Sequence, residues 1–142
     1  MKLHARKDWL QHCPKDLGAS ECVFCEKILT EPEFILWEWE HWLVVYNKYP
    51  YLWLKNHIMA LPKKHFKESH ELTREVYSEL SQVHIFIKDF FWKQEYFSFT
   101  RETFGGRSLE HLHIHFLPWK IFADEVEWLL ERQGFRNELD SE

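Results

Sequence analysis

Three histidines alternate with apolar residues near the C-terminal end of the chain, in the run His111-Leu112-His113-Ile114-His115. Residues two apart on a β-strand point to the same face. We therefore expect the three imidazoles on one face of a strand, with Leu112 and Ile114 directed into the core. Such a row can hold a metal ion, or it can do nucleophilic and acid–base work near neutral pH. The alternative is a strand whose histidines face water.

Two cysteines near the other end of the chain, Cys22 and Cys25, form a C-x-x-C pair. Two thiolates at this spacing make half of a tetrahedral zinc site, and we expect the other half among the histidines. A redox dithiol is the second interpretation, although it favours a βαβ context that this sequence lacks. The third is a pair of small buried residues. With Cys13 the cysteines number three, and this odd count favours a reducing compartment, which we take to be the cytoplasm.

The elements that must position these side chains are strands with one long helix among them. Aromatic and β-branched runs predict strands over residues 34–39, 42–46, 57–61, 95–101 and 111–117. An apolar period of 3.6 residues predicts a helix over 68–93, and a shorter helix is expected over 123–132. The pattern indicates an α+β domain, with an antiparallel sheet of about five strands, one long helix and a short C-terminal helix.

Length and charge set the limits of this interpretation. The chain has 142 residues, which suits one domain, and we expect an N-terminal extension over 1–20, the domain over 21–136 and an acidic tail over 137–142. Lys and Arg total 18 against 23 for Asp and Glu, so the net charge of −5 argues against a protein that coats a nucleic acid polymer. No run is long and apolar enough to indicate a membrane span.

Several motifs together resemble those of the histidine-triad (HIT) family of nucleotide hydrolases and transferases. The run from His111 to Leu117 matches the family signature His-φ-His-φ-His-φ-φ, where φ is apolar. Gly105-Gly106-Arg107-Ser108 resembles the family's Gly-Gly-Gln-Ser/Thr, with Arg107 in place of glutamine. The stretch from His57 to His65 resembles the strand that ends in Pro-Lys-x-His, and Cys22 to Cys25 resembles the start of the zinc-bearing branch. The resemblance covers about residues 20–120.

The resemblance implies a role for each matching residue. His113 corresponds to the nucleophile, which attacks the α-phosphorus and forms a nucleotidyl-histidine intermediate, and its Nδ1–H then needs a carbonyl acceptor. His115 and His57 correspond to imidazoles that contact the phosphate, and Ser108 to a hydroxyl near it. The implied nucleotide-binding residues are Asn47 for the ribose, Val23, Phe24 and Val45 for the base, and the backbone near Gly106 and Arg107.

In zinc-bearing members of the family, the metal ligands are two cysteines, the histidine after Pro-Lys-x and the first triad histidine. These correspond to Cys22, Cys25, His65 and His111. A Cys₂His₂ set leaves no coordination position for water, so the implied zinc is structural.

The leading hypothesis is an enzyme that cleaves at the α-phosphate of dinucleoside polyphosphates or nucleoside phosphoramidates. The retained His115 favours hydrolysis, because the transferase relatives usually carry glutamine there. The expected partners are a small nucleotide with a purine base and a second copy of the chain, with neither a nucleic acid polymer nor a membrane. The alternatives are a nucleotide-binding sensor without turnover, and a catalytic metal held by His57, His113 and His115.

Overall fold

A computed structural model describes residues 1–5, 7–8, 22–26, 31–102 and 110–133 of the chain. Its strands are β1 (Ile35–Glu38), β2 (Trp42–Tyr46), β3 (Ile58–Pro62), β4 (Tyr96–Phe99) and β5 (Ile114–Pro118). Its helices are α2 (Val23–Glu26), α3 (Arg74–Phe91) and α4 (Ala123–Arg132), with short 3₁₀ turns η3 (Pro32–Phe34), η4 (Tyr51–Trp53) and η5 (Ser69–Glu71). The boundaries expected near residues 20 and 136 lie outside the described residues.

The strands form one antiparallel sheet in the order β1-β2-β3-β5-β4. The expected α+β architecture, with five strands, one long helix and a short C-terminal helix, is confirmed. β5 is an interior strand between β3 and the edge strand β4, so His115 has a neighbouring strand on each side. The register places His115 opposite Met59 of β3 on one side and Phe99 of β4 on the other.

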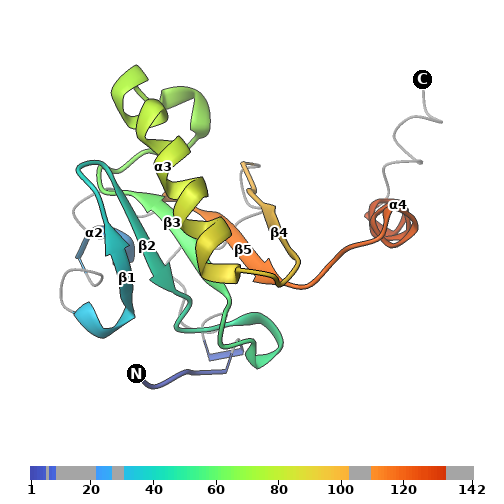
Figure 1. Ribbon diagram of the computed structural model, residues 1–142. Helices are drawn as coiled ribbons and strands as arrows, with labels where there is room; N and C mark the ends of the chain where they lie inside the picture. The colour runs from blue at the N-terminus through green and yellow to red at the C-terminus, as the bar shows by residue number, and fades with distance from the viewer. Residues whose placement is uncertain (6, 9–21, 27–30, 103–109, 134–142) are drawn as a thin grey trace.

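Helix α3 crosses one face of the sheet (Figure 1). The main core lies between them, and its fully buried members include Trp42, Val44, Val83, Ile87 and Phe116. These apolar side chains follow the strand period of two on the sheet and the helical period on α3, which explains why α3 covers this face. The opposite face of the sheet is therefore left for other residues.

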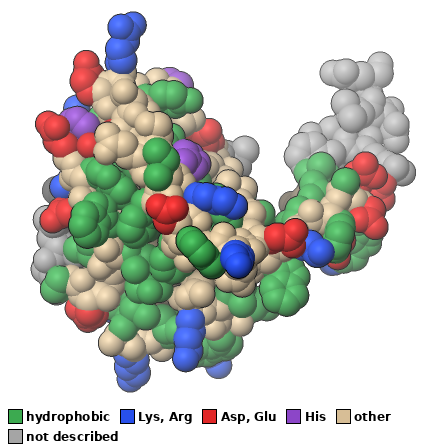
Figure 2. Space-filling model, in the orientation of Figure 1, with side chains coloured by type: hydrophobic (Ala, Val, Ile, Leu, Met, Phe, Trp, Pro, Cys, Tyr) green, Lys and Arg blue, Asp and Glu red, His purple; other side chains and the backbone are tan. Residues whose placement is uncertain are grey.

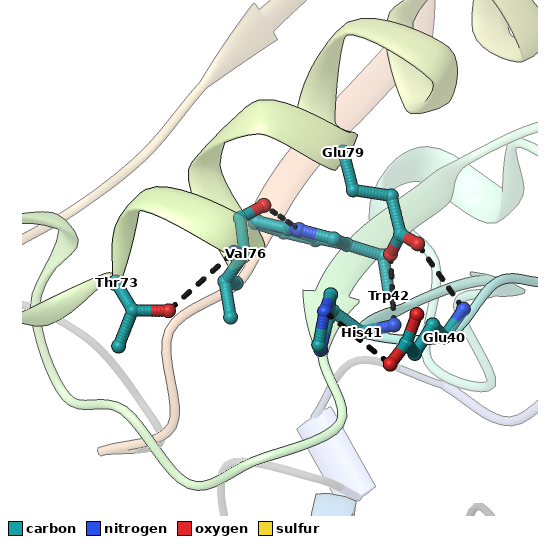
Figure 3. A network of polar contacts seen from close by, with 6 residues as sticks. All are labelled: Glu40, His41, Trp42, Thr73, Val76 and Glu79. Atoms are coloured by element: carbon teal, nitrogen blue, oxygen red, sulfur yellow. Dashed lines mark hydrogen bonds and ion pairs between the residues drawn. The ribbon is translucent and has the colours of Figure 1, made fainter.

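Polar contacts tie α3 to the turn between β1 and β2 (Figure 3). The indole Nε1–H of Trp42 donates to the carbonyl oxygen of Val76 at 2.7 Å. The carboxylate of Glu79 accepts from the backbone N–H groups of Glu40, at 3.2 Å, and His41, at 2.8 Å. A helix carboxylate thus satisfies two backbone donors of a tight turn, which fixes where β2 begins.

The long helix begins later than the apolar period predicts. The expected helix over 68–93 is wrong at its start, because residues 69–71 form the separate turn η5 and α3 begins at Arg74. The carboxylate of Glu71 accepts from the backbone N–H groups of Lys67 and Glu68 and closes that turn. Thr73 then caps α3, because its side chain accepts from the N–H of Val76.

The strand that carries the histidines is also shorter than expected. β5 begins at Ile114, so His111 and His113 precede the strand instead of lying on it. The backbone N–H of Leu112 donates to the carbonyl oxygen of Phe66 at 2.7 Å, outside the ladder between β3 and β5. Leu112 is buried in the main core and Ile114 packs against it, as expected.

Helix α4 stands away from the rest of the molecule as an arm (Figure 2). Its bounds, Ala123–Arg132, are those expected from the sequence. Large apolar side chains are exposed on it and just before it, namely Trp119, Ile121, Phe122, Trp128, Leu129 and Leu130. Within the described part of the chain, no helix has both the length and the apolar character needed to cross a bilayer.

Candidate functional site

The face of the sheet opposite α3 carries the candidate site. A second buried cluster lies on this face, made of Leu43, Val45, Met59 and Leu61, with Phe24 of α2 and Ile35 packed against it. His57 lies directly before β3, and His115 lies in β5 opposite Met59. Because side chains alternate between the two faces of a strand, His57, Met59 and Leu61 share this side of β3.

The seven predicted cysteine and histidine residues separate into two groups. The first, which we call the cysteine–histidine cluster, consists of Cys22, Cys25, His65 and His111. The second, which we call the histidine group, consists of His57, His113 and His115. Phe24 lies between the groups, with edge-on contacts to the rings of His111 at 5.7 Å and His113 at 5.2 Å between centroids.

His113 is buried, with 7% of its surface exposed, and one of its ring nitrogens is committed to the backbone. Its Nδ1 lies 2.7 Å from the carbonyl oxygen of His111. A carbonyl oxygen only accepts, so Nδ1 carries a proton, and in the neutral form of the ring Nε2 carries the lone pair. In that form the nucleophilic nitrogen is the one directed away from the backbone.

His57 and His115 form a hydrogen-bonded pair. The ring nitrogen that carries the proton in each histidine follows from the contact between Tyr51 and His57. The backbone N–H of Tyr51 donates to Nδ1 of His57 at 3.1 Å, so the proton of that neutral ring is on Nε2. Nε2 of His57 lies 2.8 Å from Nδ1 of His115 and donates to it. The proton of His115 is then on its Nε2. The chain of contacts therefore makes His115 a hydrogen-bond donor at the nitrogen farther from its backbone.

The cysteine–histidine cluster fits a tetrahedral metal ion. Its four candidate ligand atoms all lie within 4.8 Å of one another. Nδ1 of His111 is 3.5 Å from the sulfur of Cys22 and 3.5 Å from that of Cys25, and Nδ1 of His65 is 3.5 Å from the sulfur of Cys25. With Zn–S bonds of about 2.3 Å and Zn–N bonds of about 2.0 Å, a tetrahedral site places S and N about 3.5 Å apart. The cluster is compatible with zinc.

The protonation of the two cluster histidines also suits metal binding. Nε2 of His111 lies 2.8 Å from the carbonyl oxygen of Pro62, which leaves the lone pair on Nδ1, the atom that faces the sulfurs. Burial lowers the pKa of His111 to about 4, with the neighbouring His65 and His113 lowering it further and the Pro62 contact opposing the shift. Burial and the nearby Lys67 also lower the pKa of His65. Both rings are therefore neutral at pH 7.

The remaining residues singled out in the sequence have more varied positions. Val45 is buried in the floor of the site, and Phe24 is half-buried above it. Asn47 is buried and serves the following loop, because its side-chain oxygen accepts from the N–H of Tyr49 at 2.8 Å. Its side-chain nitrogen lies 3.3 Å from Nε2 of His57. The side chain of Val23 and all of Gly106, Arg107 and Ser108 lie outside the described residues.

Three residues at the site were not assigned a role from the sequence. Tyr51, from the loop between β2 and β3, and Phe99, from β4, both stack on the ring of His115. The guanidinium of Arg101, two residues beyond Phe99, donates to the Tyr51 hydroxyl at 3.3 Å. The antiparallel pairing of Phe99 with His115 was one signal that could have found them, and the aromatic character of the loop was another.

Comparison with protein-family models gives one match. Residues 21–125 match the family described as the scavenger mRNA decapping enzyme C-terminal binding domain. The matched stretch contains both groups of candidate residues. A comparison with curated proteins by sequence gives no match.

Solved structures with a similar fold include several histidine-triad proteins. One from Clostridium difficile is 22% identical with a TM-score of 0.59, covering 75% of this chain and 96% of its own. A zinc-bound histidine-triad family protein from Mycobacterium smegmatis is 18% identical with a TM-score of 0.60, covering 75% and 80%. A diadenosine triphosphate hydrolase from Plasmodium falciparum is 20% identical with a TM-score of 0.53, covering 62% of each chain. At these identities the likeness establishes the fold.

Proposed function

The chain belongs to the histidine-triad family, and on that premise we propose that it is a nucleotide hydrolase acting through His113. Its substrates are dinucleoside polyphosphates or nucleoside phosphoramidates, cleaved at the α-phosphate. One structural relative is named a diadenosine triphosphate hydrolase, which supports this class. Transfer of the nucleotidyl group to an acceptor other than water belongs to the same chemistry.

The observation that carries the proposal is the contact between Nδ1 of His113 and the carbonyl oxygen of His111, at 2.7 Å. It holds the proton on Nδ1 in advance, so no proton has to leave Nε2 before that nitrogen attacks phosphorus. The carbonyl also stabilises the positive charge that the ring gains as it attacks.

The reaction has two displacement steps. In the first, the lone pair of His113 Nε2 forms a bond to the α-phosphorus, and the bond from phosphorus to the leaving group breaks with its electron pair on the leaving group, which takes up a proton from solvent where it is an amine. In the second, a water oxygen bonds to phosphorus and releases a proton to solvent, while the N–P bond breaks and its electron pair returns to Nε2. In both steps His115 donates through Nε2–H to a nonbridging phosphate oxygen as negative charge develops there. His57 supports His115 through their 2.8 Å hydrogen bond.

The nucleotide is expected to lie over the second buried cluster. Phe24 and Val45 offer apolar surface for a purine base, and the family resemblance assigns Val23 to the same role. The ribose is assigned to Asn47, whose buried side chain lies beside His57. The family resemblance assigns the phosphate contacts of Gly106 and Arg107 and the hydroxyl of Ser108. Together these residues would orient the α-phosphorus toward His113.

Zinc is proposed as a structural ion in the cysteine–histidine cluster. The cluster has four protein ligands of the type that structural zinc prefers, and the ion would hold the segment of α2 against the loop that leads into β5. Zinc contributes no step to the chemistry at His113. Because the histidine group is joined by an internal hydrogen bond between His57 and His115, it is poorly arranged as a catalytic metal centre.

A homodimer in the cytoplasm completes the proposal. The exposed aromatic residues, among them Trp37 and Trp92, are typical of surfaces that a second subunit covers. Cys22 and Cys25 are not joined in a disulfide, which suits a reducing compartment.

The decisive experiment is mass spectrometry of the intact protein, quenched seconds after mixing with adenosine phosphoramidate or diadenosine tetraphosphate. The wild type is expected to show one added nucleotidyl group and to release AMP. His113→Ala is expected to show neither. His84→Ala is a matched control, because His84 is exposed on α3, on the opposite side of the sheet.

Two outcomes would contradict the proposal that the protein hydrolyses nucleotides through His113. Equal turnover by wild type and His113→Ala would remove His113 from the mechanism. AMP binding in calorimetry with no adduct and no AMP release from either substrate would favour a nucleotide-binding sensor instead.

A further inference from the structure

Three stacked rings lie at one end of the histidine group, with the ring of His57 tilted beside them. Phe99 stacks on His115 with centroids 4.6 Å apart and a 16° interplanar angle, and Tyr51 lies 5.6 Å from His115 at 24°. Tyr51 and Phe99 are themselves nearly parallel, at 10°. The ring of His57 lies 4.7 Å from that of Tyr51. Tyr51 is thus held beside His115, which the proposed reaction assigns to the phosphate, and beside His57, which supports His115.

The loop that supplies Tyr51 is strained. Leu52, with φ of 50°, and Trp53, with φ of 58°, both adopt the left-handed conformation that favours glycine. Each costs about 1–2 kcal/mol and persists only where its surroundings enforce it. Here the N–H of Tyr51 donates to His57, the N–H of Leu54 to the carbonyl of Tyr51 and the N–H of His57 to the carbonyl of Leu54. The strain is the consequence of fixing Tyr51 in this position.

The Tyr51 hydroxyl contacts the cationic side chain of Arg101. Nη2 of Arg101 donates to it at 3.3 Å, and both side chains are half-buried. The adjacent carboxylate, Glu102, is directed elsewhere and accepts from the N–H and the hydroxyl of Ser69, at 2.5 and 2.6 Å. Arg101 follows Phe99 out of β4, so a guanidinium and a phenolic hydroxyl lie together at the edge of the ring stack.

We propose that Tyr51 and Arg101 form a subsite for the phosphate groups beyond the one that His113 attacks. This inference rests on the proposed function and narrows its substrate class to nucleotides whose leaving group is itself a phosphate or polyphosphate. A guanidinium matches the geometry of phosphate oxygens and can bind two of them at once. A tyrosine hydroxyl both donates and accepts, so it is able to accept from arginine and to donate to a phosphate oxygen.

The alternative substrate class offers nothing for this subsite to bind. The leaving group of a nucleoside phosphoramidate is an amine, which has no anionic oxygens. A polyphosphate leaving group carries negative charge on each phosphate, and more of it develops as the bond to the α-phosphorus breaks. The subsite therefore affects the two substrate classes differently.

The test compares kcat/KM for diadenosine tetraphosphate and adenosine phosphoramidate in Arg101→Gln, Arg101→Lys and Tyr51→Phe. Arg101→Gln is expected to lower the value for the tetraphosphate by about tenfold to a hundredfold, since a hydrogen bond to a charged group is lost. The value for the phosphoramidate should change by less than about threefold. Arg101→Lys should recover part of the loss, because it keeps the charge without the planar fork. Tyr51→Phe should show a smaller selective loss, because it keeps the ring stack.

Matched controls are Arg74→Gln and Tyr77→Phe, which make the same changes at exposed positions of α3. Equal losses on both substrates would overturn the subsite and make Arg101 a purely structural residue. An unchanged ratio of the two values in all three variants would overturn it as well. Thermal unfolding of each variant identifies any that fails to fold, and the other two then carry the comparison.

Failure of the proposed function would be recognised separately, by a wild type that turns over neither substrate. The dissociation constants of AMP and of diadenosine tetraphosphate, measured by calorimetry, then test whether the subsite binds the additional phosphates. A ratio of the two dissociation constants that is the same in wild type and in Arg101→Gln would overturn it. A selective loss of tetraphosphate affinity would support it as a binding site.

Discussion

His111 and His113 are two residues apart, and they present opposite ring nitrogens to their surroundings. Nε2 of His111 faces the carbonyl oxygen of Pro62, so Nδ1 is left for the sulfurs of Cys22 and Cys25. Nδ1 of His113 faces the carbonyl oxygen of His111 itself, so Nε2 is left for chemistry. One side-chain type thus suits both the proposed metal site and the proposed nucleophile, because a backbone carbonyl selects the tautomer in each.

The proposed roles of the two groups differ, although both groups include a residue of the segment from His111 to His115. The cysteine–histidine cluster has four candidate ligands, drawn from α2 and the residue before it, from the residues after β3 and from the residues before β5. The histidine group depends on an internal chain of hydrogen bonds that starts at the backbone of Tyr51. We therefore expect changes in one group to affect stability and changes in the other to affect the rate.

The sharpest test of this separation is His113→Ala. Loss of the nucleophile is expected to lower kcat for either substrate by at least about 10⁴-fold. The zinc content, measured by atomic emission, and the melting temperature should stay close to those of the wild type, because His113 is not a ligand. Loss of zinc from this variant would break the comparison.

Cys22→Ser is expected to have the opposite pattern. Cys22 is 1% exposed, and its loss leaves an incomplete metal site in the core. We expect the free energy of unfolding to fall by about 2–4 kcal/mol, comparable to the loss of a structural cross-link or metal. A chelator should lower the melting temperature of the wild type toward that of the variant and leave the variant unchanged.

The outcome that would contradict this prediction is a kcat that collapses in Cys22→Ser at a temperature where the protein is fully folded. Zinc would then take part in the chemistry, and the two groups would act as one centre.

His57→Ala tests the support that one imidazole gives another. Without its Nε2–H, Nδ1 of His115 loses the donor that keeps its proton on the opposite nitrogen. We expect kcat to fall by about 10²-fold, the usual effect of weakening one donor to a developing oxyanion. His57→Gln retains an N–H donor and should recover part of the loss. A rise in KM with kcat unchanged would instead make His57 a residue for ground-state binding.

Much of the fold was predictable because its signals are local. The bounds of β2 and α4 follow directly from apolar runs and from helical periodicity. The start of α3 was not predictable in this way. The carboxylate of Glu71 and the cap at Thr73 compete with the apolar period that begins at Leu72. Side-chain capping of this kind acts over three or four residues and overrides a periodicity summed over many.

The candidate site divides in a similar way. The residue types of both groups were visible in the sequence, and so was the need of His113 for a carbonyl acceptor. The sequence did not show that the acceptor is the carbonyl oxygen of His111. This contact depends on His111 and His113 lying before β5 and not within it. Tyr51 and Arg101 were missed because their meeting depends on two left-handed residues in one loop and on the register of β4 against β5.

The smallest expected effect tests whether the two faces of the sheet are independent. Trp42→Phe keeps an aromatic ring in the core beneath α3 and removes the 2.7 Å hydrogen bond from Nε1 to the carbonyl of Val76. We expect a loss of about 1 kcal/mol in the free energy of unfolding by urea, with part of it due to the smaller ring. Both kcat/KM values and the zinc content should be unchanged, because Trp42 faces away from both groups. Trp37→Phe, at an exposed position of β1, is the control.

A selective loss of activity in Trp42→Phe would mean that the packing of α3 sets the geometry of the histidines through β2 and β3. The rate would then depend on both faces of the sheet.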